Sequence, residues 1–530
     1  MKKRLLATFL ALVMLIGLLP VMALAADPQT AIYIGASGDD ENSGSSPESP
    51  VATLGRVSDI IGDSADSSFI IYVMSDITTT TSLRTWNKHV TLTSYDPDSA
   101  GVIYTISRGD GMAAGSDSAR SWYNPAMIES NGSGANNASL TLYNITLDDA
   151  GNHEGEYYIQ ADSEGDGSTV FGDMDINNTS IAQDAIIATY NGVSTITLGE
   201  GTTLKNFGGM SAVRLSDGKL IMESGSLICD DSVTDRDKGT AITGASRNLY
   251  GPAGAIWMQG GTFVMEKGAE ISGIVGRAIY NEAGSVTVNG TISGVKSDAD
   301  FWQGNGGAVM HMRSEATATF GPTSVIDGDG VALSGSGIAV LGGCTLTMDS
   351  GSVITGYAGG NVLDIGGTAY LNGEITGLTG GGHAICAQSS SDHYIRTGET
   401  ANIHDNICAY GVIYTQGTNG VIDLYGKIND NISTDRGGAI VLANNGSHVE
   451  VNMYNGAEMC NNVSYQTGGA VMVSCGTFTM YGGTISGNIS GAGNVVDEDK
   501  VGGGVYVRRG GQFIMHGGEI TVNYAGSIGR

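Results

Sequence analysis

The chain has 530 residues, of which 15% are charged, and its 25 basic and 54 acidic side chains give a formal net charge of −29. So acidic a composition argues against a nucleic-acid partner, because phosphate binding depends on Lys and Arg. Glycine occupies 83 positions, yet Gly and Pro together stay below the fraction that is typical of disordered chains, so a folded, bend-rich protein is expected.

Residues 1–25 predict a secretion signal. Lys2 to Arg4 form a basic start, Leu5 to Leu19 an apolar core, and Ala23 to Ala25 a small-residue cleavage site. The apolar core is short for a bilayer span, and no later stretch approaches about 20 apolar residues. We therefore expect an exported protein without a transmembrane segment, whose mature net charge is −32 from 22 basic and 54 acidic side chains.

Residues 26–67 are expected to form an N-terminal capping module. A short strand is predicted at Ala31 to Ile34, and a polar loop follows from Gly35 to Pro50. The stretch from Ala52 to Ile61 predicts an amphipathic helix. One face of this helix carries Leu54, Val57, Ile60 and Ile61. Such a helix makes sense as a lid over the core and strand edge of a stacked fold.

Residues 68–530 are dominated by an internal repeat. Between Gly468 and Asn523 the chain reads GGAVMV and GTFTMYGGTISGN, and then GGGVYV and GGQFIMHGGEITVN. Looser copies of the same three runs extend back to Ala255. Each run has four to six residues in which apolar and polar side chains alternate, as in strands with one buried face.

One apolar residue of the third run serves as a phase marker for the repeat. The markers are Ile271, Ile292, Ile326, Ile354, Ile375, Ile403, Ile428, Met459, Ile485 and Ile520. Their intervals average near 28 residues, shorter than the roughly 40 of a β-propeller blade, and the repeats lack helical periodicity. Three short strands per turn predict an all-β, right-handed parallel β-helix of about 17 coils, about 80 Å long at the spacing between strands.

Asparagine recurs three residues after the marker in the last five repeats. These residues are Asn406, Asn431, Asn462, Asn488 and Asn523. Two interpretations stay open, a buried ladder of bonded amides or separate turn residues. In earlier repeats Gly273, Gly294, Gly356 and Gly377 stand two residues after the marker instead.

Two segments resemble known bacterial proteins. The stretch IYIGASGDDENSGSSPESPVATL resembles a module ahead of bacterial β-helix domains, including polysaccharide lyases, in which a strand, a G-x-D-x-N-x-G loop and a P-x-x-T-L helix start follow in this order. The GGAI-like and I-x-x-N-like repeats resemble those of bacterial surface adhesins, including polymorphic outer-membrane protein repeats, and more broadly the pectate-lyase-like superfold. This resemblance covers most of residues 68–530.

The resemblance implies a non-enzymatic, adhesin-like or stalk protein, secreted or on the bacterial cell surface, that presents loops from a rod. Its expected partners are glycans or host-cell molecules. Because the same fold also hosts enzymes, the alternative is a lyase or glycoside hydrolase that acts on acidic polysaccharides.

No catalytic residue is identified by the sequence. Paired aspartates occur at Asp148 and Asp149 and again at Asp230 and Asp231. Two carboxylates can serve as the acid and base of a glycosidase, but we expect these to be solvated turn residues. The segment Gly382 to Ala384 lacks the second glycine of the G-H-G of polygalacturonase-like hydrolases, and neither N-T-D nor R-I-K occurs.

A calcium site is a minor alternative, and no other cofactor is expected. The acidic loop that suggests it contains Asp230, Asp231, Asp235, Arg236, Asp237 and Lys238. Several carboxylates in one loop suit Ca²⁺, although a merely charged loop is the simpler interpretation. The eight histidines lack zinc-site spacing, and His404 and His516 are expected to face outward.

Aromatic residues, one serine and the cysteines suggest three further features. Trp122-Tyr123 and Phe301-Trp302 lie in polar loops, where they would stack on sugars or pack back onto the coil. Ser336 lies between two glycines but lacks the context of a nucleophile elbow.

The cysteines, at positions 229, 344, 386, 408, 460 and 475, are expected to be mostly buried hydrophobes, with Cys460 and Cys475 the best candidates for a disulfide.

The last repeat reads as an interior one, because Ile520 to Asn523 matches the repeats before it. An uncovered coil offers an open core and a strand edge. We therefore expect further chain or another molecule to cover this end. No LPxTG-like sorting motif is present, so the mode of surface attachment is left open.

Overall fold

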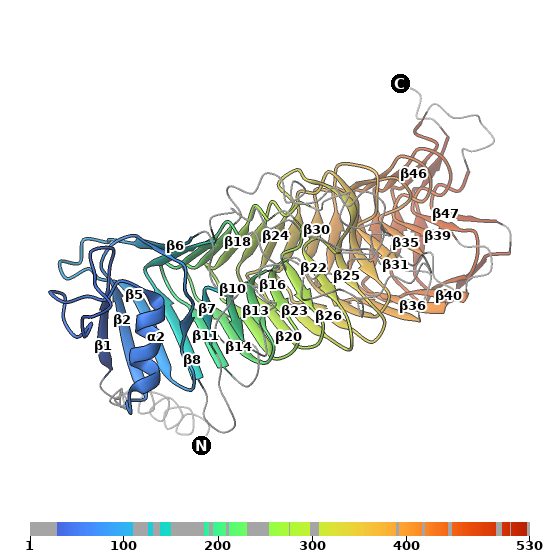
Figure 1. The fold of residues 1–530 in the computed structure, drawn as a ribbon. Helices are drawn as coiled ribbons and strands as arrows, with labels where there is room; N and C mark the ends of the chain where they lie inside the picture. The colour runs from blue at the N-terminus through green and yellow to red at the C-terminus, as the bar shows by residue number, and fades with distance from the viewer. Residues whose placement is uncertain are drawn as a thin grey trace, which may run out of the picture.

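The fold is all-β in this computed structural model. It describes residues 29–109, 126–130, 138–149, 185–189, 194–207, 211–229, 254–274, 276–296, 307–387, 392–415, 419–443, 448–493, 501–508 and 510–526. The chain winds as an elongated coil whose strands stack into parallel sheets along its length (Figure 1). The expected parallel β-helix is thereby confirmed.

Four sheets form the walls of the helix, and every pairing between their strands is parallel. Sheet A has 16 strands: β1 Thr30–Ile34, β2 Ser68–Val73, β5 His89–Ser94, β8 Ala138–Tyr143, β11 Ser194–Leu198, β14 Gly218–Met222, β17 Thr262–Met265, β20 Ser285–Val288, β23 Thr317–Phe320, β26 Thr345–Met348, β29 Thr368–Leu371, β32 His393–Thr397, β36 Asn419–Leu424, β40 His448–Met453, β44 Thr477–Met480 and β48 Gln512–Met515. Its fifteen spacings give a length of about 72 Å.

Sheet B has 15 strands: β3 Ile77–Thr79, β6 Tyr104–Arg108, β9 Ile145–Asp148, β12 Thr203–Lys205, β15 Leu227–Cys229, β18 Glu270–Ser272, β21 Thr291–Ser293, β24 Val325–Asp327, β27 Val353–Thr355, β30 Glu374–Thr376, β33 Asn402–His404, β37 Lys427–Asn429, β41 Glu458–Cys460, β45 Thr484–Ser486 and β49 Glu519–Thr521. Sheet C has 14 strands: β4 Leu83–Arg84, β7 Ile128–Glu129, β10 Ala185–Thr189, β13 Ser211–Leu215, β16 Gly254–Met258, β19 Ile279–Asn281, β22 Met310–Met312, β25 Ala332–Val340, β28 Gly359–Ile365, β31 Ile385–Ala387, β35 Ile413–Thr415, β39 Ile440–Leu442, β43 Val471–Val473 and β47 Val505–Val507.

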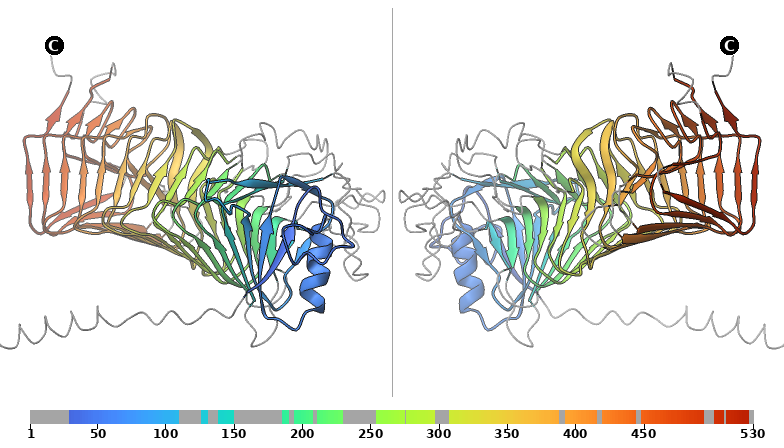
Figure 2. Two further views of the ribbon diagram at one scale, coloured as in Figure 1. Left: turned by 90° about the vertical axis from the view of Figure 1, so that its left-hand side faces the viewer. Right: turned by 90° about the vertical axis from the view of Figure 1, so that its right-hand side faces the viewer.

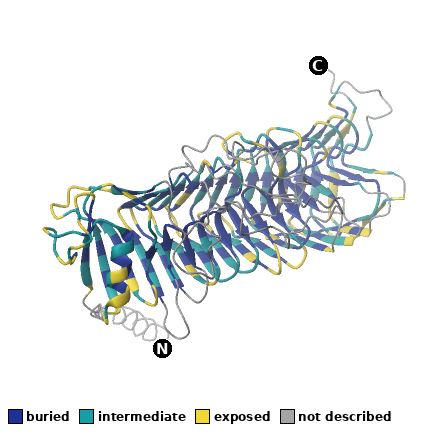
Figure 3. Cartoon of the chain, viewed as in Figure 1, coloured by how far each residue is buried: buried dark blue, intermediate teal, exposed yellow. Residues whose placement is uncertain are grey.

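The hydrophobic core is built by side chains that alternate between inward and outward directions along each strand. In a strand such as β17, Phe263 and Met265 point inward and are fully buried, while Thr262 and Val264 point outward. Figure 3 shows this alternation of buried and less buried residues along the stack. The phase markers stack in register in sheet B, as in the pairs Ile271 with Ile292 and Ile485 with Ile520. The phase that the marker residues predict for the repeat is therefore confirmed.

The last five described coils contain a fourth strand that the sequence analysis missed. These two-residue strands form sheet D: β34 Ile407–Cys408, β38 Ile432–Ser433, β42 Val463–Ser464, β46 Ile489–Ser490 and β50 Tyr524–Ala525. Each one directly follows an asparagine of the repeat. The prediction of three strands per turn is wrong here, because the asparagine turns the chain sharply enough for a short extra wall to form, seen at the C-terminal end of the rod in Figure 2.

The repeated asparagines form a buried ladder, which decides between the two interpretations. Asn406, Asn431, Asn462 and Asn488 are completely buried. Each side-chain amide donates from Nδ2 to Oδ1 of the next asparagine, at 3.0 Å for the first three steps and 2.8 Å for the step from Asn488 to Asn523. Each Oδ1 also accepts the backbone N–H of the asparagine before it.

The N-terminal end of the rod is covered as expected. Strand β1 pairs with β2 and so adds the first strand of sheet A. Helix α2 (Leu54–Asp63) buries Leu54, Val57 and Ile61 against the hydrophobic core (Figure 2). Among the described residues, no helix is long and apolar enough to cross a membrane. The predicted signal at residues 1–25 lies outside the described residues.

At the other end, the inward side chains of the last coil are exposed. Met515 is 46% exposed, whereas its partner in the preceding coil, Met480, is fully buried. Ile520 is 36% exposed above the buried Ile485.

The expectation that the cysteines are mostly buried hydrophobes is confirmed for three of the six, while Cys229, Cys460 and Cys475 are only partly buried. Cys344, Cys386 and Cys408 are buried, and burial raises the pKa of Cys408 to about 12. The predicted Cys460–Cys475 disulfide is wrong. Cys460 is a free thiol on sheet B, with its Sγ 3.3 Å from Ser486 Oγ, and Cys475 lies between β43 and β44.

Candidate functional site

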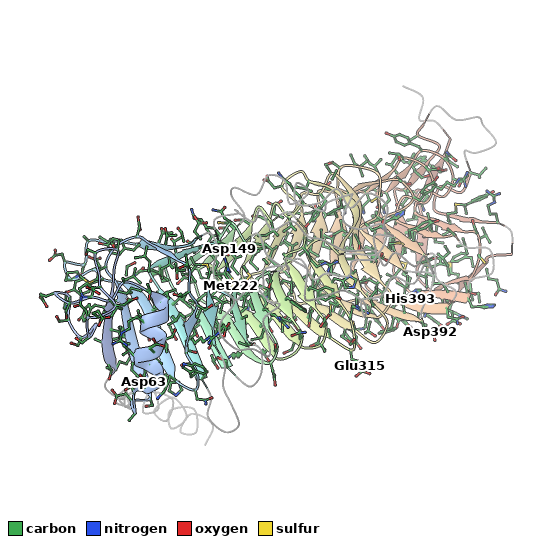
Figure 4. All side chains as sticks on the ribbon, in the orientation of Figure 1. Asp63, Asp149, Met222, Glu315, Asp392 and His393 are labelled. Atoms are coloured by element: carbon green, nitrogen blue, oxygen red, sulfur yellow. The ribbon has the colours of Figure 1, made fainter. Side chains whose placement is uncertain are left out.

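Asp148 and Asp149 are held in ion pairs at the end of β9. Asp149 is 1% exposed and pairs with Arg108, and Asp148 Oδ2 lies 3.5 Å from Lys205 Nζ. The expectation of solvated turn residues is wrong, because Arg108, 41 residues earlier, provides Asp149 with a buried partner. Asp149 lies towards the N-terminal part of the rod in Figure 4. Both carboxylates are therefore held by basic partners from other strands of the coil.

Three of the sequence-based predictions fall outside the described residues. They concern the aromatic pairs Trp122-Tyr123 and Phe301-Trp302 and the acidic loop from Asp230 to Lys238. Within the described residues, no group of three or more His, Cys, Asp and Glu side chains is arranged to hold a metal ion. The calcium site in the acidic loop stays a prediction.

Histidine and serine residues singled out by the sequence occupy strands and turns. His383 is 8% exposed, its ring stacks on Tyr414 at 4.5 Å, and its Nδ1 lies 3.1 Å from the Gly411 carbonyl oxygen. Burial lowers the pKa of His383. Ser336 lies within β25, not at a strand-to-helix turn. His404 ends β33, where Glu374 and Asp405 contact its two ring nitrogens.

The outer face of sheet A carries a polar and aromatic surface on its C-terminal half. It consists of Tyr370, Tyr394, Arg396, Asp423, Asn452 and Tyr454, which we call the tyrosine–aspartate platform. The register places Tyr370, Arg396, Asp423 and Asn452 side by side on β29, β32, β36 and β40. Because these positions alternate with buried ones, all four side chains face outward.

Asp423 is the centre of this platform. Its carboxylate accepts hydrogen bonds from Tyr394 Oη at 3.0 Å, Asn452 Nδ2 at 3.1 Å and Tyr454 Oη at 3.3 Å. Burial, the hydrogen bond to Asp423 and its charge raise the pKa of Tyr394 to about 12. Burial and the same carboxylate raise the pKa of Tyr454 to about 12. Both phenols therefore stay protonated at neutral pH and hold fixed positions around one carboxylate.

A column of stacked rings borders the platform at the turn that leaves sheet A. Tyr425 and Tyr454 are 4.5 Å apart and inclined by 4°, and Tyr481 and His516 continue the stack at 5.4 and 5.3 Å. The Arg396 guanidinium lies 4.6 Å from the Tyr425 ring centre. Stacked rings cover one another's faces, so mainly the ring edges are left for contact with a ligand.

Tyr370 differs from the rings of the column. It is 39% exposed, and its ring meets that of Tyr394 edge-on at 6.0 Å and 70°. The platform thus combines an exposed aromatic ring with a guanidinium, a carboxylate, an amide and phenol groups on a regular sheet. This chemistry suits a ligand with both hydroxyl groups and apolar faces.

Sheet C carries a different cluster, which we call the arginine–aromatic strip: Arg214, Trp257, Arg277, Tyr280, His311 and Arg313. The Arg214 guanidinium lies 4.5 Å from the Trp257 ring centre, and Tyr280 stacks on His311 at 5.4 Å. Arg313 Nη1 donates to Tyr280 Oη at 3.0 Å. Burial chiefly, and the Arg313 charge, lower the pKa of Arg277 to about 10, so it stays a cation at neutral pH.

Two carboxylates lie on this row beyond the ends of the strip, Glu129 two strands before Arg214 and Asp364 two strands after His311. The register runs from Tyr280 through His311 and Ala339 to Asp364. Three strand spacings, about 14 Å, therefore separate Asp364 from Tyr280. A glycosidase places two carboxylates about 5 to 10 Å apart on either side of the bond that is cleaved, and the strip contains no such pair among the described residues.

The sequence contains a signal for the ring column beside the platform. Aligned on the inward-facing residue that ends each sheet A strand, the repeats read DLYG, NMYN, TMYG and IMHG, so an aromatic residue recurs at one position. That pattern predicts the ring column. Asp423 gives no such signal, because its three donors come from the coils on either side of its own, Tyr394 from the preceding one and Asn452 and Tyr454 from the following one.

Comparison with known proteins adds no family to these observations. No family model matches the chain, and none of the curated proteins matches it either.

Proposed function

We propose that this protein is an exported, adhesin-like rod, secreted or held at a bacterial cell surface, that binds glycans through the tyrosine–aspartate platform. The observation that carries the proposal is Asp423 with its three donors beside the exposed ring of Tyr370. Side chains that are already fixed lose little conformational entropy when a ligand binds, which favours affinity.

The platform is suited to sugars for two reasons. A sugar ring has a face of C–H groups that packs on an exposed aromatic ring, as Tyr370 provides. Its hydroxyl groups need both donors and acceptors, and Arg396, Asn452 and the phenols supply both. A site on a strand-borne surface is also held more precisely than a site on a loop.

A glycan array probed with residues 26–530 tests this proposal. We expect selective binding that Tyr370→Ala weakens at least about tenfold, since removing an exposed aromatic anchor commonly costs 1 to 2 kcal/mol or more. Tyr465→Ala is the matched control, because Tyr465 is also 39% exposed but lies next to sheet D. Equal losses in both variants, or no glycan binding by the unmodified protein, would contradict the proposal.

The alternative is a lyase or hydrolase of acidic polysaccharides, and one observation favours it. The arginine–aromatic strip gathers the guanidinium groups of Arg214 and Arg313, neither of which is buried, in a protein whose net charge is −29. Incubation with polygalacturonate and alginate, followed by measurement of unsaturated and reducing ends, tests this alternative. Release of either product by the unmodified protein but not by Arg214→Gln would favour the enzyme over the adhesin.

A further inference from the structure

The platform is not isolated on its sheet, because two rows of outward side chains lead into it. The first row is Thr262, Ser285, Thr317, Thr345 and Thr368, and it ends on Tyr394. The second row is Val264, Thr287, Thr319 and Thr347, and it ends on Tyr370. We call these nine residues the threonine face. They lie on β17, β20, β23, β26 and β29, in the lower front wall of the rod in Figure 1.

This face is uncharged over its whole length. Each of its nine side chains is Thr, Ser or Val, whereas Lys219 faces outward on the preceding strand, β14, and Arg396 on the following strand, β32. In a chain with 54 acidic residues, so long a neutral stretch is a local departure from the average surface. A polyanion gains no charge attraction there, and an uncharged ligand avoids any cost of burying a charge.

The threonines are also fixed in orientation. A β-branched side chain in a strand has few allowed χ1 rotamers, so its hydroxyl and methyl groups keep constant directions. Ser285 Oγ donates to Thr262 Oγ1 at 3.2 Å, which links neighbouring coils. Five spacings separate Thr262 from Tyr394, so hydroxyls and methyls repeat along about 24 Å in line with the platform.

We propose that the ligand of the platform is an unbranched, uncharged polysaccharide that lies along the rod and contacts the threonine face as well as the tyrosines. This inference rests on the proposed function, since it names the class of glycan that the same surface binds. A linear polymer presents hydroxyls and C–H faces at regular intervals, and its neighbouring sugars meet the threonines when its first sugars meet Tyr370 and Tyr394.

Length dependence distinguishes this ligand from a short terminal glycan. The probes are cellobiose, cellohexaose and hydroxyethyl cellulose, with mannobiose, mannohexaose and linear mannan as a second neutral series and polygalacturonate as the charged polymer. We expect at least one neutral series to bind, with the hexasaccharide at least about tenfold tighter than the disaccharide. Polygalacturonate is expected to bind more weakly than the neutral polymer.

The double variant Thr287→Val/Thr319→Val tests the face itself, because these two threonines lie three and two strands away from Tyr370. Valine keeps the shape and strand preference of threonine but removes its hydroxyl. Loss of two hydrogen bonds is expected to weaken hexasaccharide binding about tenfold, with disaccharide binding unchanged. Thr291→Val on β21 is the control, because Thr291 faces outward from sheet B. Thermal unfolding of each variant checks that the coil is intact.

The results separate two proposals, glycan binding by the platform and the extension of its ligand over the threonine face. Equal affinity for disaccharide and hexasaccharide, or unchanged hexasaccharide binding in the double variant, overturns the threonine face while glycan binding by the platform stands. Preference for polygalacturonate also overturns it. If no glycan of any length binds, the proposed function fails and this inference fails with it.

Discussion

Each asparagine of the ladder satisfies groups that the bend between sheets B and D would otherwise leave unpaired. Asn462 Nδ2 donates to the Ile428 carbonyl at 2.8 Å and to Asn488 Oδ1 at 3.0 Å, and its Oδ1 accepts the Asn431 backbone N–H at 3.2 Å. Because the site is completely buried, no water replaces a lost partner. The sequence contained the spacing of this ladder but not its burial, so two interpretations stayed open until the coils were placed.

His404 makes stability depend on pH. Burial alone would lower its pKa, but the hydrogen bonds to Asp405 and Glu374 and their charges outweigh burial, so the pKa of His404 is raised. A raised pKa means that the folded state binds the proton more tightly than the unfolded state. The stabilisation is therefore fully present below the unfolded pKa of about 6.5 and is lost as the pH rises through the folded value.

We predict that His404→Gln destabilises the protein at pH 5.5 and has a smaller effect at pH 8.5. The loss is expected to stay below about 1 kcal/mol, because Glu374 and Asp405 are largely in contact with water. Urea unfolding at the two pH values measures it, with His448→Gln as the control at an exposed histidine of β40. A loss that grows with pH would contradict the assigned direction of the pKa shift.

At the scale of elements, one carboxylate fixes the start of helix α2. Asp40 accepts hydrogen bonds from the backbone N–H groups of Ala52 at 2.9 Å and Thr53 at 3.0 Å, and from Thr53 Oγ1 at 2.7 Å. Thr53 Oγ1 in turn accepts the Arg56 backbone N–H and so caps the helix. These contacts give a physical reason for the G-x-D-x-N-x-G and P-x-x-T-L pattern noted in the sequence.

We predict that Asp40→Ala loosens the helix from the end of the rod, at a cost of about 1 to 3 kcal/mol for the lost hydrogen bonds to a charged group. Trp86 is a local reporter, since a Cβ at Gly62 in the last turn of α2 would lie 3.4 Å from its Nε1. Its fluorescence should change at a lower urea concentration than in the unmodified protein. Asp39→Ala removes only the contact to the Glu41 N–H, so an equal shift there would refute the capping role.

The elements that were predicted correctly are those set by local pattern. Alternation and glycine spacing located the strands of sheet B, and the 3.6 period located helix α2. The wrong predictions depend on which coils become neighbours, as the Arg108–Asp149 ion pair and the absent disulfide at Cys460 show, and so do the donors around Asp423, for which no prediction was made. Insertions of varying length separate successive coils, so the register between distant residues was not fixed by the repeat alone.

At the scale of the whole molecule, the rod is a stack in which each coil contacts only its neighbours, so its stability is a sum of local terms and interfaces between adjacent coils. Long arrays of this kind depart from two-state unfolding. The four tryptophans, at positions 86, 122, 257 and 302, all precede the asparagine ladder. Fluorescence therefore reports on the N-terminal coils, while far-UV circular dichroism reports on every coil.

We predict that Asn462→Ala separates these two signals. The substitution leaves the Ile428 carbonyl and the Asn431 N–H without their buried partner, which costs about 3 kcal/mol in the C-terminal coils. Part of the circular dichroism change should then occur at a lower urea concentration than in the unmodified protein, while the midpoint of tryptophan fluorescence stays in place. Asn455→Ala, in the exposed turn after β40, should move neither signal. If Asn462→Ala lowers both midpoints equally, the coils unfold as one cooperative unit and the rod is not a sum of its neighbours.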